Sequence, residues 1–199
     1  FLARLGTQSS VAYYEGGVAQ AITAILAEMG LGYSKDGFGN IILRLRGRHA
    51  DVPPLALVAH MDHPGFEAVG TQGDLIIGEA LGGVPAASFT AGVPLTLLLA
   101  DGRRLSALSA GRHGEESDRR GLIKLEEAQP VDLPCPVVFD LTDFRVEGDL
   151  IHMRAADALA GCAAILGAIA SLAETPPAGD VFAVFTRAEE VGLVGARLM

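Results

Sequence analysis

The chain has 199 residues, half of them hydrophobic, which is enough for one large domain or for a medium domain carrying a smaller insertion. Its 24 acidic residues outnumber 15 basic ones, giving a net charge of -9 that argues against nucleic acid and anionic membranes as partners. The two cysteines, Cys135 and Cys162, have no paired spacing, so we expect buried free thiols rather than a disulfide framework or a zinc knuckle.

The N-terminal region predicts a helix followed by a strand pair. The chain begins at Phe1 rather than Met and shows no basic leader with a short apolar core, so we expect a cytoplasmic protein whose true N-terminus precedes Phe1. Apolar residues at helical spacing predict a helix from a cap at Ser9 or Ser10 to about Met29. Residues 33–35 and 40–46 then indicate a hairpin-like pair of strands.

An apolar strand at 55–59 comes next, and we expect it to lie inside a sheet covered on both faces. From about residue 70 to 149 the helical periodicity disappears, and short β-rich runs alternate with glycine and proline clusters. This texture predicts an all-β, barrel-like inserted domain at 70–149. Its most polar piece, residues 111–121, has mixed charges that favour a solvated loop, with a binding element as the alternative.

Beyond residue 149 an α/β pattern resumes, with a strand at 150–153, a helix at 157–174 and a strand at 181–186. Residues 1–69 and 150–199 are therefore predicted to form one α/β domain, a mixed sheet with helices on both faces. The apolar run 158–173 is shorter than the roughly 20 residues of a membrane span, and its small residues predict a helix close against the sheet. The chain stops at Met199 near the start of a further element, so we expect an incomplete C-terminus.

Imidazole and carboxylate side chains stand where these elements end or begin. His60 and Asp62 follow the strand at 55–59, Asp157 opens the helix, and Glu189-Glu190 follows the strand at 181–186. In open α/β sheets the ligand crevice lies beyond the carboxyl ends of the strands, so these side chains could share one cleft. One histidine, a carboxylate able to bridge and a pair of glutamates fit a hydrolytic metal site.

Each of these groups also has a structural explanation. His60 could be a hydrogen-bonded histidine at a strand end, Asp157 could cap its helix, and Glu189-Glu190 could be a solvated acidic turn. Apolar segments on both sides of Glu189-Glu190 favour a functional role there. In an extended segment the two side chains would point to opposite sides, so that one could bind metal while the other moves protons.

Three motifs stand in order along the chain: His60-Met61-Asp62, Ala156-Asp157 with Gly161-Cys162, and Glu189-Glu190-Val191-Gly192-Leu193 with Gly195-Ala196. Together they resemble the cocatalytic dizinc aminopeptidases of the glutamyl and tetrahedral aminopeptidase family, and the match spans most of the chain. The resemblance implies a zinc-peptidase fold that removes N-terminal residues from short peptides by means of a metal-activated water. It also implies a homo-oligomer assembled through the inserted domain.

The same resemblance assigns roles to the site residues. His60 would ligate one of two divalent metal ions, Asp157 would bridge both, and Glu190 would ligate the other. The metal would be zinc, with cobalt or manganese as alternatives. Glu189 would be the general base that deprotonates the bridging water, and Asp62 would steady His60.

The chain also departs from the family pattern. It has Asp62-His63-Pro64-Gly65 where the family usually has Asp-Glu-Ile-Gly, and Asp157-Ala158-Leu159 where the family usually has Asp-Asp-Arg. The family takes a further aspartate and histidine from later sequence, beyond Met199. These departures leave a metal-free member or fragment, serving as a binding or assembly module, as the alternative function. A hydrolase that cleaves an amide in a non-peptide substrate is a third possibility.

Overall fold

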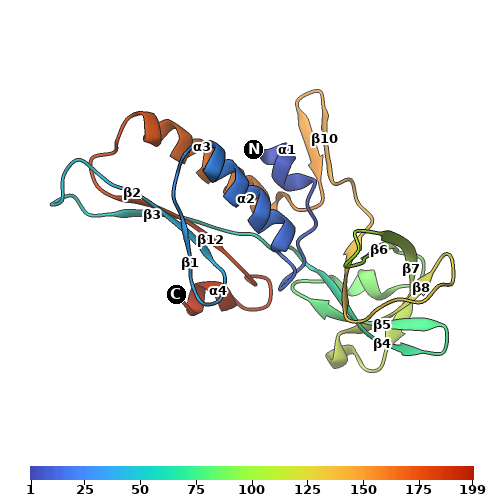
Figure 1. The fold of residues 1–199 in the computed structure, drawn as a ribbon. Helices are drawn as coiled ribbons and strands as arrows, with labels where there is room; N and C mark the ends of the chain where they lie inside the picture. Colours follow the sequence, from blue (N-terminus) through green and yellow to red (C-terminus); the bar gives the residue numbers. More distant parts are fainter. The chain divides into compact units, whose positions relative to one another are not determined.

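The computed structural model describes all 199 residues, which form two compact units (Figure 1). The first unit contains residues 1–63 and 142–199, and the second, inserted unit contains residues 64–141. The sequence placed the insertion at 70–149. In the structure it begins earlier, because β4 (Gly65–Gln72) already belongs to it, and ends earlier, because β10 (Phe144–Glu147) pairs with β11 (Leu150–Met153) in the first unit.

The first unit is built on a four-stranded mixed sheet in the order β1-β2-β12-β3. β1 (Ser34–Lys35), β2 (Ile41–Leu45) and β12 (Val181–Thr186) are antiparallel neighbours, which confirms the hairpin and the last strand predicted from the sequence. β12 runs parallel to β3 (Leu55–His60), with Thr186 in register with His60. This pairing brings the carboxyl ends of β3 and β12 together, where the candidate site residues follow.

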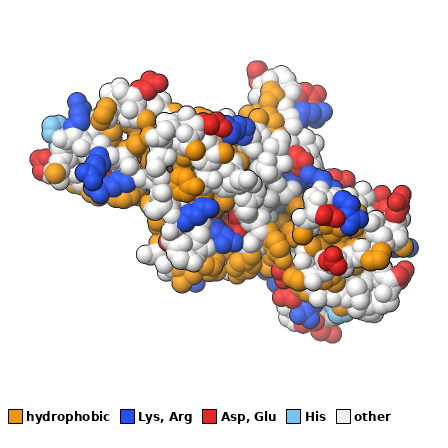
Figure 2. All heavy atoms as spheres, in the orientation of Figure 1, with side chains coloured by type: hydrophobic (Ala, Val, Ile, Leu, Met, Phe, Trp, Pro, Cys, Tyr) orange, Lys and Arg blue, Asp and Glu red, His pale blue; other side chains and the backbone are white.

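β3 lies at the edge of this sheet, and no strand of the structure pairs with its outer side. Leu55 is 56% exposed and Val58 is 58% exposed, and Figure 2 shows hydrophobic side chains reaching the surface of this unit. The expectation that this strand is buried on both faces is therefore wrong. A strand is fully buried only when it has a neighbouring strand on each side and a packed layer on each face. β3 has a neighbouring strand on one side only and a packed layer on one face only.

Two helices cover one face of the sheet, α2 (Gly16–Glu28) and α3 (Ala156–Glu174). α2 begins later than predicted, because Ser10 does not cap it: the Ser10 hydroxyl is buried and donates to the Met61 carbonyl over 2.6 Å. Two short helices, α1 (Leu2–Gly6) and α4 (Val194–Arg197), lie near the chain ends. The sheet and the two long helices share a core, whose largest members are Leu5, Ile22, Ile25, Leu26, Ile41, Leu43, Met61 and Phe185.

α3 is long and apolar enough to cross a membrane by length and composition alone. In this fold it packs on the sheet, with five core residues on one side: Leu159, Cys162, Ile165, Leu166 and Ile169. Its small residues permit the close approach that the sequence predicted, since a Cβ placed on Gly161 would lie 3.2 Å from the Ala59 Cβ. Both cysteines are buried and free, as predicted.

The inserted unit is a closed six-stranded barrel in the order β4-β5-β8-β7-β6-β9, in agreement with the predicted barrel-like insertion. Its strands after β4 are β5 (Leu75–Leu81), β6 (Pro94–Leu98), β7 (Arg104–His113), β8 (Arg120–Leu125) and β9 (Cys135–Phe139). Two short 3₁₀ helices, η1 (Ala86–Phe89) and η2 (Glu116–Asp118), join them. Phe66 anchors a separate core, with edge-to-face contacts to Phe89 and Phe139.

Candidate functional site

His60 ends β3 and turns its ring toward the other candidate residues. Nδ1 lies 3.1 Å from the backbone carbonyl oxygen of Asp62, and because a carbonyl only accepts, this nitrogen carries a proton. Nε2 faces the opposite way, 3.2 Å from Oδ1 of Asp157 and 3.7 Å from Oε2 of Glu189. Loss of the second ring proton would therefore free Nε2 as a ligand atom that points at carboxylates from two other segments.

Asp157 lies in the first turn of α3, where the backbone of Asp157 and Ala158 is not helical. No side-chain hydrogen bond caps this end of the helix, so the capping explanation finds no support in the structure. The Asp157 side chain is 88% exposed and reaches His60 instead. Its carboxylate is thus available to a ligand in the space beside the imidazole.

Glu189 and Glu190 lie in a turn directly after β12. Their backbone amides donate to the two carboxylate oxygens of Asp62, each over 3.0 Å, and the amides of Gly192 and Leu193 donate to the Glu189 carbonyl. The segment is therefore not extended, and the expectation that the two glutamates point to opposite sides is wrong. Ligand atoms of His60, Glu189 and Glu190 all lie within 4.8 Å of one another.

The turn is held by residues that the sequence analysis missed. Glu15 is fully buried, with Oε1 accepting from the Ala188 amide and Oε2 from Nε of Arg187, over 2.9 and 2.8 Å. Asn40 accepts from the Arg187 amide over 3.0 Å and donates to the Gly195 carbonyl over 2.9 Å. Glu15 was hidden inside a predicted helix, although the following Gly16-Gly17 pair could have indicated a helix start there.

The charges around His60 shift its ionisation. Burial alone lowers the pKa of His60, but the hydrogen bond and charge of Asp62, together with the charge of Glu189, outweigh it and raise the pKa to about 9. Burial raises the pKa of Asp62, but its hydrogen bonds with His60 and with the two glutamate amides lower the pKa by more. The pKa of Asp62 is therefore below its usual value. The positive charge of the protonated His60 ring thus offsets the negative charge of the surrounding carboxylates. A bound divalent cation could supply that positive charge instead.

The donor set fits such a cation. One imidazole and three carboxylates, from Asp157, Glu189 and Glu190, are the nitrogen and oxygen ligands that zinc, cobalt and manganese accept in proteins. The backbone of His60 is also held in place, since the buried Cys162 thiol donates to the His60 carbonyl over 3.2 Å. Burial raises the pKa of that thiol to about 12, so it stays protonated and structural.

A mixed sheet with an inserted barrel, and a histidine–carboxylate cluster where its parallel strands end, make up the kind of α/β fold with a β-rich insertion that the sequence indicated. Residues 124–199 match the sequence model of the M42 glutamyl aminopeptidase family. The predicted resemblance to glutamyl and tetrahedral aminopeptidases is therefore confirmed. No curated protein matches the chain.

Solved structures share the fold. The TET1 peptidase of Pyrococcus horikoshii, which can assemble into a tetrahedron or a large octahedral shell, matches with a TM-score of 0.81 and 23% identity over 99% of this chain. A TET aminopeptidase from a marine sediment archaeon of the Thaumarchaeota matches with a TM-score of 0.83 and 17% identity over 98% of this chain. A Thermotoga maritima structure described as an endoglucanase matches with a TM-score of 0.74 and 23% identity over the whole chain.

These three neighbours are longer than the present chain, which spans 63%, 60% and 62% of their respective lengths. At identities of 17–23% the likeness concerns the fold.

Proposed function

We propose that this chain forms part of a metal-dependent, aminopeptidase-like hydrolase that removes N-terminal residues from short peptides. The observation that carries the proposal is the convergence of His60 with the carboxylates of Asp157, Glu189 and Glu190, which come from separate segments of the chain. The fold that holds this cluster is shared with TET aminopeptidases, and the matching sequence family is one of glutamyl aminopeptidases.

In this proposal His60, Asp157 and Glu190 hold two divalent cations, zinc in the first instance or cobalt or manganese. Such cations, when bound, lower the pKa of a bound water and polarise a peptide carbonyl. Glu189 accepts the proton of the attacking water and passes it to the leaving amine. Asp62 keeps both glutamates in place through their backbone amides and keeps the proton-bearing Nδ1 side of His60 fixed.

The assembly and location follow as further parts of the proposal. One TET1 neighbour is described as a dodecamer, and the P. horikoshii peptidase as forming a tetrahedron or an octahedral shell. By analogy we expect a homo-oligomer assembled through the inserted barrel. Two buried free thiols are consistent with a cytoplasmic protein, where cysteines stay reduced.

The test separates metal binding from catalysis. In the purified full-length protein, Glu189→Gln should keep the metal content of the parent and lose peptide hydrolysis by about 100-fold or more, the size of a general-base effect. Asp157→Ala should lose metal together with activity, because it removes a carboxylate that would hold the metal. Glu174→Gln, at the far end of α3, is the matched control and should change neither. Unchanged turnover in the Glu189 or Asp157 variant would refute the role assigned to that residue.

The substrate panel separates the rival functions. Short peptides with a free N-terminus should be cleaved, and the same peptides with an acetylated N-terminus should not. Hydrolysis of a β-glucan or of a non-peptide amide, without release of free amino acids from the peptides, would replace the aminopeptidase assignment. A parent protein that binds no zinc, cobalt or manganese would favour the metal-free binding or assembly module, for which Ala158 and Leu159, in place of the family's Asp and Arg, already argue.

A further inference from the structure

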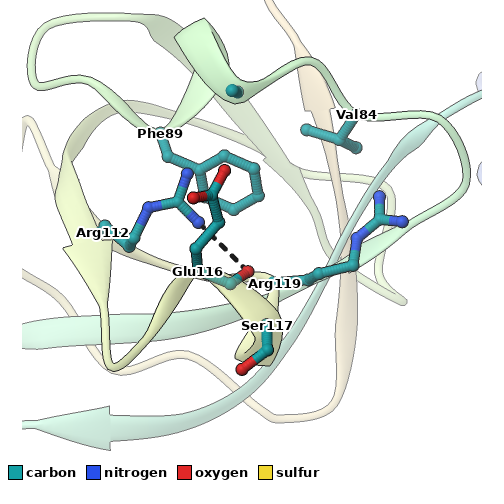
Figure 3. A pocket seen from close by; sticks show the side chains of 7 residues that line it. Val84, Phe89, Arg112, Glu116, Ser117 and Arg119 are labelled. Atoms are coloured by element: carbon teal, nitrogen blue, oxygen red, sulfur yellow. Dashed lines mark hydrogen bonds between the residues drawn. The ribbon is translucent and has the colours of Figure 1, made fainter.

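The inserted barrel carries a pocket of its own between η1 and η2, with a volume of about 320 Å³ (Figure 3). One wall is apolar and the other is charged. The lining residues are Val84, Ala86, Phe89, Arg112, Glu116, Ser117 and Arg119. The charged wall comes from the polar segment 111–121, for which the sequence left a binding element as the alternative to a solvated loop.

Both arginines in this pocket lack a carboxylate partner. The Arg112 guanidinium lies 4.5 Å from the centroid of the Phe89 ring and donates to the backbone carbonyl of Glu116 over 3.5 Å, while Arg119 donates to the backbone carbonyl of Gly82. Each guanidinium has five N–H donors, so most of them remain available to a ligand. Figure 3 shows the Arg112 guanidinium beside the Phe89 ring and the Glu116 side chain, and the Arg119 guanidinium on the other side of the pocket, below Val84.

Two further charged side chains of this region, Asp118 and Arg120, have partners outside the pocket lining. The Asp118 carboxylate accepts from the backbone amide of Glu115 over 3.0 Å, and Arg120 pairs with Glu79 over 3.0 Å. The side chains that line the pocket carry two positive charges, from Arg112 and Arg119, and one negative charge, from Glu116, which is a net charge of +1. The Asp118 carboxylate beside them keeps its own negative charge, because a backbone amide is neutral. The net charge of the lining is matched by a monoanion better than by a phosphate dianion.

The apolar wall is packed against the core of the barrel. Phe89 is 6% exposed and packs edge-to-face on Phe66 with 5.6 Å between the ring centroids, and Val84 is 8% exposed. A ligand that used only its charge would leave the small exposed part of this wall in water, whereas a ligand with an apolar group would cover that part. The pocket volume suits a small molecule or the last residue of a peptide.

We infer that this pocket binds a small organic carboxylate, with the carboxylate held by Arg112 and Arg119 and an apolar group against Phe89 and Val84. Guanidinium groups bind carboxylates through charge-assisted hydrogen bonds, which are the strong ones. The inference goes beyond the proposed function and is tested by binding alone, so its failure would leave the metal and hydrolysis tests unaffected.

The experiment compares probes by isothermal titration calorimetry on the full chain. N-acetyl-L-leucine, which has a carboxylate and an apolar side chain, should bind at least tenfold more tightly than N-acetyl-L-leucinamide, which lacks the charge, and than inorganic phosphate, which lacks the apolar group. Equal binding of the acid and the amide, or tighter binding of phosphate, would overturn the inference. A peptide ending in leucine that binds tenfold more tightly still would identify a polypeptide C-terminus as the source of the carboxylate.

Variants locate the binding. Arg112→Gln and Arg119→Gln should each weaken N-acetyl-L-leucine binding about tenfold, the loss of one charge-assisted contact. Ala86→Phe, which fills the pocket and leaves both arginines in place, should abolish binding while the protein keeps its thermal unfolding midpoint. Arg103→Gln is the matched control, because Arg103 lies in the same barrel paired with Asp101, and it should bind like the parent. Parent-like affinity in the three pocket variants would show that the ligand binds elsewhere.

Discussion

Glu15 shows how a single buried carboxylate can fix the candidate site from outside it. Its side chain is fully buried, and its partner Arg187 is 27% exposed, with 2.7 Å between Oε2 and the Arg187 guanidinium. Arg187 also donates to the backbone carbonyls of Tyr13 and Phe38, so it joins the N-terminal segment to the turn that carries Glu189. The pair therefore holds together segments that are far apart along the chain and adjacent to the site.

Glu15→Gln should destabilise the protein by about 2–3 kcal/mol, because it leaves the partly buried Arg187 charge without its counter-ion while keeping the shape of the side chain. Urea unfolding monitored by circular dichroism measures the change. The matched control is Arg4→Gln, which breaks the exposed ion pair with Glu28 and should have little effect. A Glu15 variant as stable as the Arg4 variant would show that the buried pair does not hold the turn.

At the level of elements, the packing of α3 on β3 determines where His60 lies. Gly161 faces Ala59, the residue directly before His60, and a Cβ at Gly161 would lie only 3.2 Å from the Ala59 side chain. Gly167 lies further along the same helix, and a Cβ added there would meet no atom within 4 Å. The two glycines of one helix thus differ in their surroundings, which permits a direct comparison.

Gly161→Leu should destabilise the protein by about 1–3 kcal/mol, because the larger side chain must push α3 away from β3 in a tightly packed core. Gly167→Ala should instead stabilise it by about 0.5–1 kcal/mol, because alanine restricts the unfolded chain and favours the helix. Thermal or urea unfolding of both variants checks the two signs. If Gly161→Leu were as stable as the parent, the close approach of helix and strand would not exist in solution.

Some of the elements and contacts were predictable from the sequence and others were not. The strand at 181–186 and the hairpin before residue 46 were predictable because local apolar patterns decide them. The proximity of His60 to Glu189 followed from the rule that parallel strands end at one edge. The start of α2 was not predictable, because Ser10 and Glu15 are committed to residues 61 and 187–188, far along the chain.

The direction in which the Glu189 and Glu190 side chains point could not be predicted from the sequence for a similar reason. It depends on a tight turn in which Ala188 has a φ of 53° and Asp62 accepts both following amides. No local pattern encodes a contact with a carboxylate from another strand end. The exposure of β3 at the sheet edge could not be predicted either, because an apolar run in the sequence does not indicate how many strands pair with it.

For the whole molecule, the insertion separates the two halves of the first unit along the chain. β2 and β3 come from residues before the barrel and β12 from residues after it, so the four-stranded sheet closes only when β12 joins them. The barrel, by contrast, is continuous in sequence and has its own core. Contacts that are close in sequence form at a lower cost in chain entropy, so the barrel is the unit better suited to fold without the other.

A polypeptide of residues 64–141 should therefore fold alone. A closed barrel leaves no open strand edge, and its first strand pairs with its last, Phe66 with Val137, so the two cut ends lie close together. Calorimetry should show one cooperative transition with an enthalpy of roughly 50 kcal/mol, the value typical of about 80 residues. Leu97→Asp, which places a charge in the centre of the barrel core, should abolish the transition. A gradual, non-cooperative loss of structure in the parent polypeptide would instead show that the barrel depends on the first unit.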